Sequence, residues 1–174
     1  MKASVYCMTH TLEQTEAIVA DLKRAGFGRQ DVSALLPDLR GTRDFAYEHD
    51  TKAPEGATAG GVAGLGAGAA LGWLAGIGAL AIPGMGSFIA AGPVMSALSG
   101  AALGTTAGGI AGALVGAGMP EFEARRFDGK IRQGGMLISV HVESANQRKA
   151  ARGIFEQHHA EDITTGTEAH ASTR

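Results

Sequence analysis

Each end of the chain carries a hydrophobic pattern that predicts strands alternating with helices. At the first end, side-chain character alternates over residues 3–8, which predicts a strand. Apolar residues at helical spacing predict a helix over residues 12–25, and a second strand is predicted over residues 31–36. The first end of the chain therefore predicts a β-α-β unit.

The other end shows the same kinds of pattern. Residues 120–133 predict a helix with Phe122, Phe127 and Ile131 near one face, and clean alternation predicts a strand over residues 136–142. A further helix follows the strand. Its apolar positions include Ala151, Ile154 and Phe155.

Capping residues mark where these helices begin and end. Thr11 with Gln14, and Ser144 with Gln147, have the spacing of a capping box. Gly26 is placed to end the first helix in a left-handed conformation.

Together the two ends predict an α+β, ferredoxin-like split β-α-β domain built from residues 1–55 and 119–164. Its last strand is expected over residues 161–164, followed by a polar tail over residues 165–174. Residues 56–118 are then an insertion between the second and third strands.

The insertion differs from the rest in composition. It holds 19 of the 27 glycines, and no Asp, Glu, Lys, Arg or His occurs over residues 56–120. Its glycines recur every fourth residue, so on a helix they share one face. The spacing predicts a glycine-zipper hairpin of two helices, over residues 56–82 and 93–119, in which bare backbones approach closely. The positions in this predicted helix-packing interface are Gly56, Gly60, Gly64, Gly68, Gly72, Gly76, Gly100, Gly104, Gly108, Gly112 and Gly116.

The other faces of the predicted hairpin are apolar and need to be covered. Each helix is long enough to cross a bilayer, so membrane insertion is one interpretation. Burial in a lipid-free homo-oligomeric core and packing within the chain itself are the others. The uncharged tip, residues 85–91, is unusual for a loop that emerges into water. The residues expected to face lipid or a partner are Leu71, Trp73, Leu74, Ile77, Leu80, Phe88, Ile110 and Leu114.

Composition narrows the classes of function. The net charge of −2 argues against a nucleic-acid-binding protein. The one cysteine, Cys7, reads as a small hydrophobic residue on a strand. His158 and His159 lack partners at metal-ligand spacing and are expected to be solvated at a helix end. His141 lies on the strand face opposite Ile138 and Val140, where it is expected either to hydrogen-bond across the sheet or to face solvent. No phosphate-binding loop motif is present, and the sequence therefore predicts neither an enzyme nor a cofactor.

Four segments carry a resemblance to known proteins. They are residues 51–56 (TKAPEG), 72–84 (GWLAGIGALAIPG), 90–93 (AAGP) and 134–141 (GGMLISVH). Over about residues 3–164 the chain resembles the bacterial general-stress and low-temperature-induced protein families. The resemblance implies a stress-linked, non-enzymatic bacterial protein associated with membranes.

These observations give two functional hypotheses. The first is a membrane-associated, self-associating protein, with membrane lipid and further copies of the chain as partners. Basic residues flank the insertion, so its globular domain is expected in the bacterial cytoplasm. The alternative is a small-ligand sensor of ferredoxin-like type tethered to a membrane, with its ligand unknown.

Overall fold

The computed structural model describes residues 3–37, 71, 73–74, 78–82, 86–92, 109–116 and 118–167. Most of the predicted glycine ladder, together with one of the residues expected to face outward, lies outside these ranges. The predicted site residues that lie outside the described ranges are Gly56, Gly60, Gly64, Gly68, Gly72, Gly76, Ile77, Gly100, Gly104 and Gly108.

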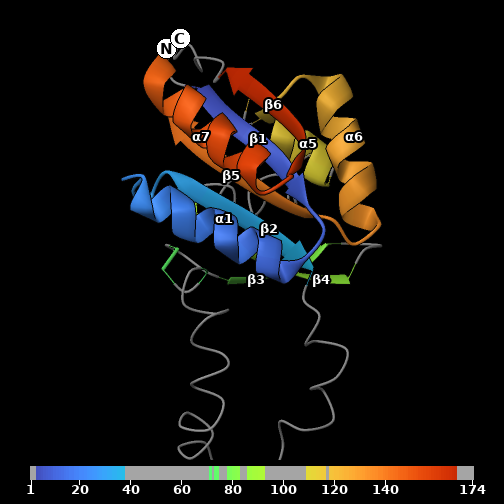
Figure 1. Cartoon of the computed structure of the whole chain (residues 1–174). Coiled ribbons are helices and arrows are strands. Elements are labelled where there is room, and N and C mark those ends of the chain that lie inside the picture. The colour runs from blue at the N-terminus through green and yellow to red at the C-terminus, as the bar shows by residue number, and fades with distance from the viewer. Residues whose placement is uncertain are drawn as a thin grey trace, which may run out of the picture.

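The described part of the chain is α+β, as predicted, and strands and helices come from both halves of the sequence (Figure 1). The elements in chain order are β1 (Ala3–Thr9), α1 (Leu12–Arg24), β2 (Val32–Pro37), β3 (Gly78–Ile82), β4 (Gly86–Ala91), α5 (Ile110–Gly116), α6 (Glu121–Arg132), β5 (Met136–Val142), α7 (Ala145–Gln157) and β6 (Glu161–Thr167).

The strands form one sheet in the order β3-β4-β2-β5-β1-β6. Every neighbouring pair runs antiparallel. At the centre, Val140 of β5 lies opposite Val5 of β1 on one side and Val32 of β2 on the other. Because paired residues point to the same face, this register gives each face of the sheet its own set of side chains.

Helices cover both faces of the sheet (Figure 1). On one face, α1 and α7 pack against an apolar layer that includes Val5, Ile138 and Phe155. On the other, α5 and α6 cover a layer that includes Met8 and Phe127. Each helical layer therefore has a hydrophobic core of its own.

The capping predictions are confirmed. The Thr11 hydroxyl accepts a hydrogen bond from the Gln14 amide at 3.1 Å, and the Ser144 hydroxyl accepts one from the Gln147 amide at 3.1 Å. Gly26 has φ +90° after the last turn of α1. These local signals work because a cap satisfies backbone groups that the helix leaves free.

Two details at the second end of the chain differ from the prediction. Phe122, expected on the inner face of α6, is 76% exposed, while Phe127 and Ile131 are buried as expected. Phe122 lies in the first turn of α6, where Ala124 takes the buried position. Strand β6 runs to Thr167, so the predicted tail begins within a strand.

The predicted helices of the insertion need correction. Residues 78–82, expected at the end of a helix, form strand β3, and much of the expected loop at the tip forms strand β4. The second helix, expected over residues 93–119, ends in the described region as the seven-residue α5 followed by residues 118–120, which are not helical.

The physical reason is that β2 offers backbone partners that a helical tip would leave unused. Strand β4 pairs with β2 from Ala34↔Ala91 to Pro37↔Phe88, and β3 pairs with β4. Strand pairing satisfies the exposed N–H and C=O groups along the outer side of β2. A helix in the same place would carry glycine at a cost of about 1 kcal/mol per position relative to alanine.

The expectation of transmembrane helices is also overturned. Of the helices in the described residues, none combines the length and the apolar character that crossing a bilayer demands. The longest, α1 and α7, have 13 residues each, against the ~20 apolar residues that a span needs. The prediction of transmembrane helices is therefore wrong for the residues that the structure describes.

Candidate functional site

The residues expected to face lipid or a partner lie mostly against the chain's own sheet. Leu74 is 5% exposed and belongs to the core beneath α1 and α7, with Leu71 and Trp73 packed against it. The Lys23 ammonium lies 5.5 Å from the centre of the Trp73 ring, a cation–π distance that ties this segment to α1.

The remaining described members of that set lie in or beside the opposite layer. Phe88 is 3% exposed, Ile110 and Leu114 are essentially buried, and all three belong to the core beneath α5 and α6. Leu80 lies in β3. The described parts of the insertion thus fold back onto the domain, which is the intramolecular packing that the sequence left as its third interpretation.

Two glycines of the predicted helix-packing interface are described. Gly112 and Gly116 both lie in α5. A Cβ atom added at Gly116 would meet none of the described residues within 4 Å, so none of them packs closely on this position.

The strongest candidate for a binding site is the outer face of α7. Ser144 caps the helix, and the backbone amide of Glu143, the residue before the cap, donates to the Gln147 side chain at 2.8 Å. Ala151 and Phe155 are fully buried and hold the inner face of α7 on the sheet. The opposite face is left to polar and charged side chains.

The far end of α7 is fastened to α1. His158 Nε2 lies 2.8 Å from Asp21 Oδ2, and the His158 carbonyl accepts a hydrogen bond from Gln14 Nε2 at 2.7 Å. The prediction of a solvated His158 is therefore wrong, because the two helices share one layer and bring Asp21 beside it. These contacts hold α7 in a fixed position.

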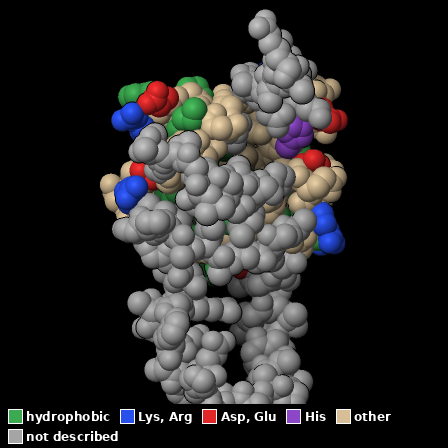
Figure 2. Space-filling model, turned by 180° about the vertical axis from the view of Figure 1, so that it is seen from behind, with side chains coloured by type: hydrophobic (Ala, Val, Ile, Leu, Met, Phe, Trp, Pro, Cys, Tyr) green, Lys and Arg blue, Asp and Glu red, His purple; other side chains and the backbone are tan. Residues whose placement is uncertain are grey.

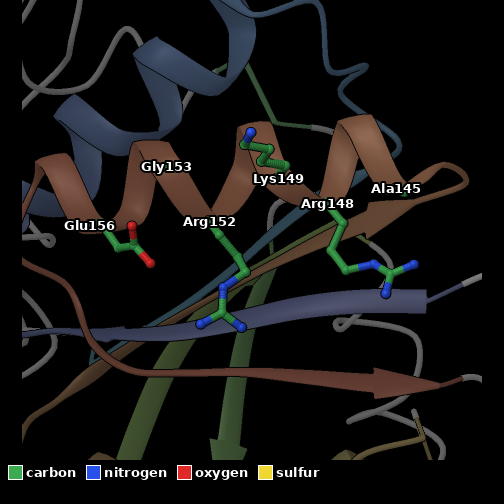
Figure 3. Close-up of a pocket in the computed structure, with 6 residues that line it drawn as sticks. All are labelled: Ala145, Arg148, Lys149, Arg152, Gly153 and Glu156. Atoms are coloured by element: carbon green, nitrogen blue, oxygen red, sulfur yellow. The ribbon is translucent and has the colours of Figure 1, made fainter.

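A groove of about 370 Å³ runs along this outer face (Figure 3). Arg148, Arg152 and Glu156 follow one another at four-residue intervals and leave the helix on the same side, while Lys149 lies over the helix itself (Figure 3). We call this set the α7 groove. Its lining residues are Ala145, Arg148, Lys149, Arg152, Gly153 and Glu156.

The cations of the α7 groove have no acidic partner in the part of the chain that the structure describes. Within the described residues, the side chains of Arg148, Lys149 and Arg152 make neither an ion pair nor a hydrogen bond. All three are exposed. They form a concentration of positive charge that the fold leaves uncompensated.

Helix α6 shows the opposite arrangement. Arg125 pairs with Glu121 at 2.7 Å, Arg132 pairs with Asp128 at 2.9 Å, and Lys130 pairs with Glu161 at 2.9 Å. Its fourth cation, Arg126, pairs with Asp162 of β6. Figure 2 shows the side of the molecule opposite to α1 and α7, where basic side chains lie next to acidic ones.

The order of charges along each helix explains this difference. In α6 the acids Glu121 and Asp128 each precede their arginine by four residues, the favourable order for such a pair. In α7 the order is reversed, since Arg152 precedes Glu156 by four residues. The reversed pair is weaker, and the two side chains do not join.

The helix dipole strengthens the contrast. Helices α1 and α6 carry acidic residues in the first turn and basic residues in the last, which suits the dipole. Helix α7 has neither, and it places Arg148 and Lys149 in its first half and Glu156 near its end. The charges of α7 are therefore placed against the helix dipole, unlike those of α1 and α6. Departures of this kind from local preference concentrate at functional sites.

Other residues that carry chemistry show little sign of a reactive centre. Cys7 is fully buried, and burial raises the pKa of its thiol far above the ordinary range. His141 lies opposite Ser4 in the β1–β5 pairing. Among the residues that the structure describes, no group of three or more His, Cys, Asp and Glu is placed to hold a metal ion.

The α7 groove is not among the predicted sites, although the sequence carries a signal for it. The capping box at Ser144 fixes where the helix begins, and from there three cations precede the only acid of the helix. Reading charge order against the predicted dipole would have marked Arg148, Lys149 and Arg152 as unusual. The absence of partners for them required the fold.

Comparisons of the chain with protein-family models, with curated proteins and with solved structures gave no match. The site must therefore be interpreted from its own geometry.

Proposed function

We propose that the domain is ferredoxin-like, with an insertion between its second and third strands. The support is the order of four strands, β2-β5-β1-β6, with α1 following β1 and α7 following β5. Strands β3 and β4 extend this sheet beyond β2, and they come from the glycine-rich insertion.

This domain acts as a non-enzymatic binding module that recognises an anionic ligand in the α7 groove. The observation that carries the proposal is the reversed and unpaired charge of α7, beside helices that obey the dipole. Arginine side chains present planar forks of N–H donors that suit phosphate and carboxylate groups. The proposal corresponds to the ligand-sensor hypothesis, without its membrane tether.

A regulatory rather than catalytic role fits the chemistry of the described residues. The groove supplies two guanidinium groups, an ammonium group and one carboxylate. The buried Cys7, with its raised pKa, is a poor nucleophile. We retain the resemblance to bacterial stress proteins as part of this proposal, with a cytoplasmic ligand that reports a change in the state of the cell.

Inorganic pyrophosphate is the probe that tests this function. At a hundredfold excess over its Kd, a ligand specific to the native state raises the melting temperature of a chain of this size by roughly 5–10 °C. The double variant Arg148→Gln/Arg152→Gln should lose this increase. The matched control is Arg125→Gln/Arg132→Gln on α6, whose cations are already paired.

The expected result is an increase in melting temperature for the natural chain and the α6 control, and none for the α7 variant. An equal increase in both double variants would overturn the site, because it would show binding elsewhere. No increase in the natural chain at millimolar pyrophosphate would overturn the function.

Self-association is a second candidate. Phe122 of α6 is 76% exposed and Val115 of α5 is 42% exposed, and these two side chains are the apolar groups on α5 and α6 that a second copy of the chain could cover. Light scattering should then give a mass of two or more chains, falling toward one chain for Phe122→Ser. A monomeric natural chain would exclude this candidate.

A further inference from the structure

The α7 groove is asymmetric along its length, and the asymmetry says which part of a ligand lies where. Arg148 and Arg152 lie one helical turn apart, with Lys149 beside them, and Glu156 lies one turn further on. At 1.5 Å per residue, Arg148 and Glu156 are about 12 Å apart along the helix axis. An extended small molecule can therefore contact both ends.

The carboxylate of Glu156 restricts the ligand at its end of the groove. An ionised carboxylate accepts hydrogen bonds and donates none, and it repels another anion. The anionic part of the ligand must lie over Arg148 and Arg152. The part that reaches Glu156 must be uncharged or cationic and must donate hydrogen bonds.

The surface between these two ends is bare. Gly153 follows Arg152, and a Cβ atom built there would meet nothing within 4 Å. A glycine in a helix interior is destabilising relative to alanine, and no packing against the described residues accounts for it here. A ring can lie directly on the backbone at this position.

We infer that the α7 groove binds a nucleoside diphosphate, with the diphosphate between Arg148 and Arg152 and the ribose hydroxyls on Glu156. Two guanidinium groups match two phosphoryl groups, and the ring of the ribose lies over Gly153. The two vicinal hydroxyls of the ribose donate to the carboxylate oxygens. This inference rests on the proposed function, because it identifies the ligand of the same site.

The test compares three probes on the full chain by calorimetric titration: pyrophosphate, ADP and 2′-deoxy-ADP. We expect ADP to bind about tenfold more tightly than 2′-deoxy-ADP, since one hydrogen bond to a charged group is lost. Glu156→Gln should remove most of this preference and strengthen pyrophosphate binding, because the variant removes a carboxylate that repels the anion. Glu143→Gln, an exposed acid just outside the groove, is the matched control and should keep the preference.

The outcomes separate the inference from the proposed function. If pyrophosphate binds in the α7 groove but ADP and 2′-deoxy-ADP bind equally, or Glu156→Gln keeps the preference, the nucleotide is refuted and anion binding stands. If pyrophosphate does not bind, both fail. A preference that both Glu156→Gln and Glu143→Gln abolish would also refute the assignment of the hydroxyls to Glu156.

Discussion

Gly92 lies where the glycine-rich insertion leaves the sheet, and its substitution tests the corrected structure of that insertion. The residue follows β4 and has φ +82°, a conformation that side chains other than glycine rarely adopt. A Cβ atom at Gly92 would lie 2.3 Å from the Val32 carbonyl oxygen and 2.9 Å from the Ser33 Cα atom. Both neighbours are backbone atoms of β2, which cannot rotate away as a side chain would.

The magnitude follows from two separate terms. The left-handed conformation alone costs a residue with a Cβ atom roughly 1–2 kcal/mol. Restoring an ordinary contact of 3.4 Å requires β4 and β2 to separate by about 1.1 Å, which weakens the pairing between them at a cost of about 1–2 kcal/mol per lost hydrogen bond. Gly92→Ala should therefore destabilise the protein by about 3 kcal/mol and lower its melting temperature by roughly 6–12 °C.

The assay is thermal and urea unfolding followed by circular dichroism, with Gly26→Ala as the matched control. Gly26 has φ +90°, but a Cβ atom there would meet nothing within 4 Å, so this variant carries only the conformational term of roughly 1–2 kcal/mol. The difference between the two variants measures how closely β4 lies on β2. If Gly92→Ala is no more destabilising than Gly26→Ala, the pairing of β4 with β2 is refuted, and a stabilising effect would favour a helical tip.

Three further predictions concern the core and the buried or paired carboxylates. Phe127→Ala should destabilise by about 3–5 kcal/mol in urea unfolding, whereas Phe122→Ala, at an exposed position, should stay within about 0.5 kcal/mol. Burial raises the pKa of Glu16, so its charged form is disfavoured in the folded state, and Glu16→Gln should raise the melting temperature at pH 7 but not at acidic pH. The hydrogen bond from Lys130 holds the pKa of Glu161 below its usual value. The stability that this carboxylate contributes is present above its pKa in the unfolded chain and is lost as the pH falls through its lower pKa in the folded protein. Glu161→Gln should therefore reduce the loss of folding stability at acidic pH.

Each of these three can fail in a distinct way. Equal losses for the two phenylalanine variants would show that α6 does not present the face described. A Glu16→Gln gain that persists at acidic pH would mean that desolvation of the charge is not its cause. An unchanged acid dependence in Glu161→Gln would show that its hydrogen bond with Lys130 is not kept in solution.

The parts of the fold that local signals determine could be predicted from the sequence. The caps at Thr11 and Ser144 and the alternation over residues 136–142 each depend on neighbours a few residues away. Backbone groups at helix ends and side chains on alternate faces impose these patterns locally. The predicted and observed bounds agree there within a residue or two.

The strands of the insertion could not be predicted in the same way, because β3 and β4 lie between the two runs of the glycine ladder and contain none of its positions. The two ladder glycines that the structure describes, Gly112 and Gly116, lie in helix α5. The four-residue period therefore carried no signal for the strands. The deciding contact, the pairing of Leu36 with Ile89, joins residues far apart in the sequence.

The α7 groove could be predicted from the sequence only in part. Its charge order is local and readable, but whether its cations find partners depends on which acids the fold brings near. Asp162 shows this, since it reaches Arg126 and Lys130 of α6 only because β6 returns to the sheet beside β1. Among the described residues, no strand brings an acid into an ion pair with Arg148 on α7.

The placement of the unpaired cations on α7 also follows from how the two helical layers are held. Ala151 and Phe155 attach α7 to the sheet, and the contacts of His158 with α1 fasten its end. None of these attachments uses the outer face of the helix. Each charge that opposes the dipole costs about 0.3–1 kcal/mol, a small part of the roughly 5–15 kcal/mol by which a folded domain is stable. The domain can therefore keep Arg148 and Lys149 at positions where their charges oppose the helix dipole. An anion bound between these side chains and Arg152 would offset this unfavourable interaction. The same charges that destabilise the free protein would then favour the bound state.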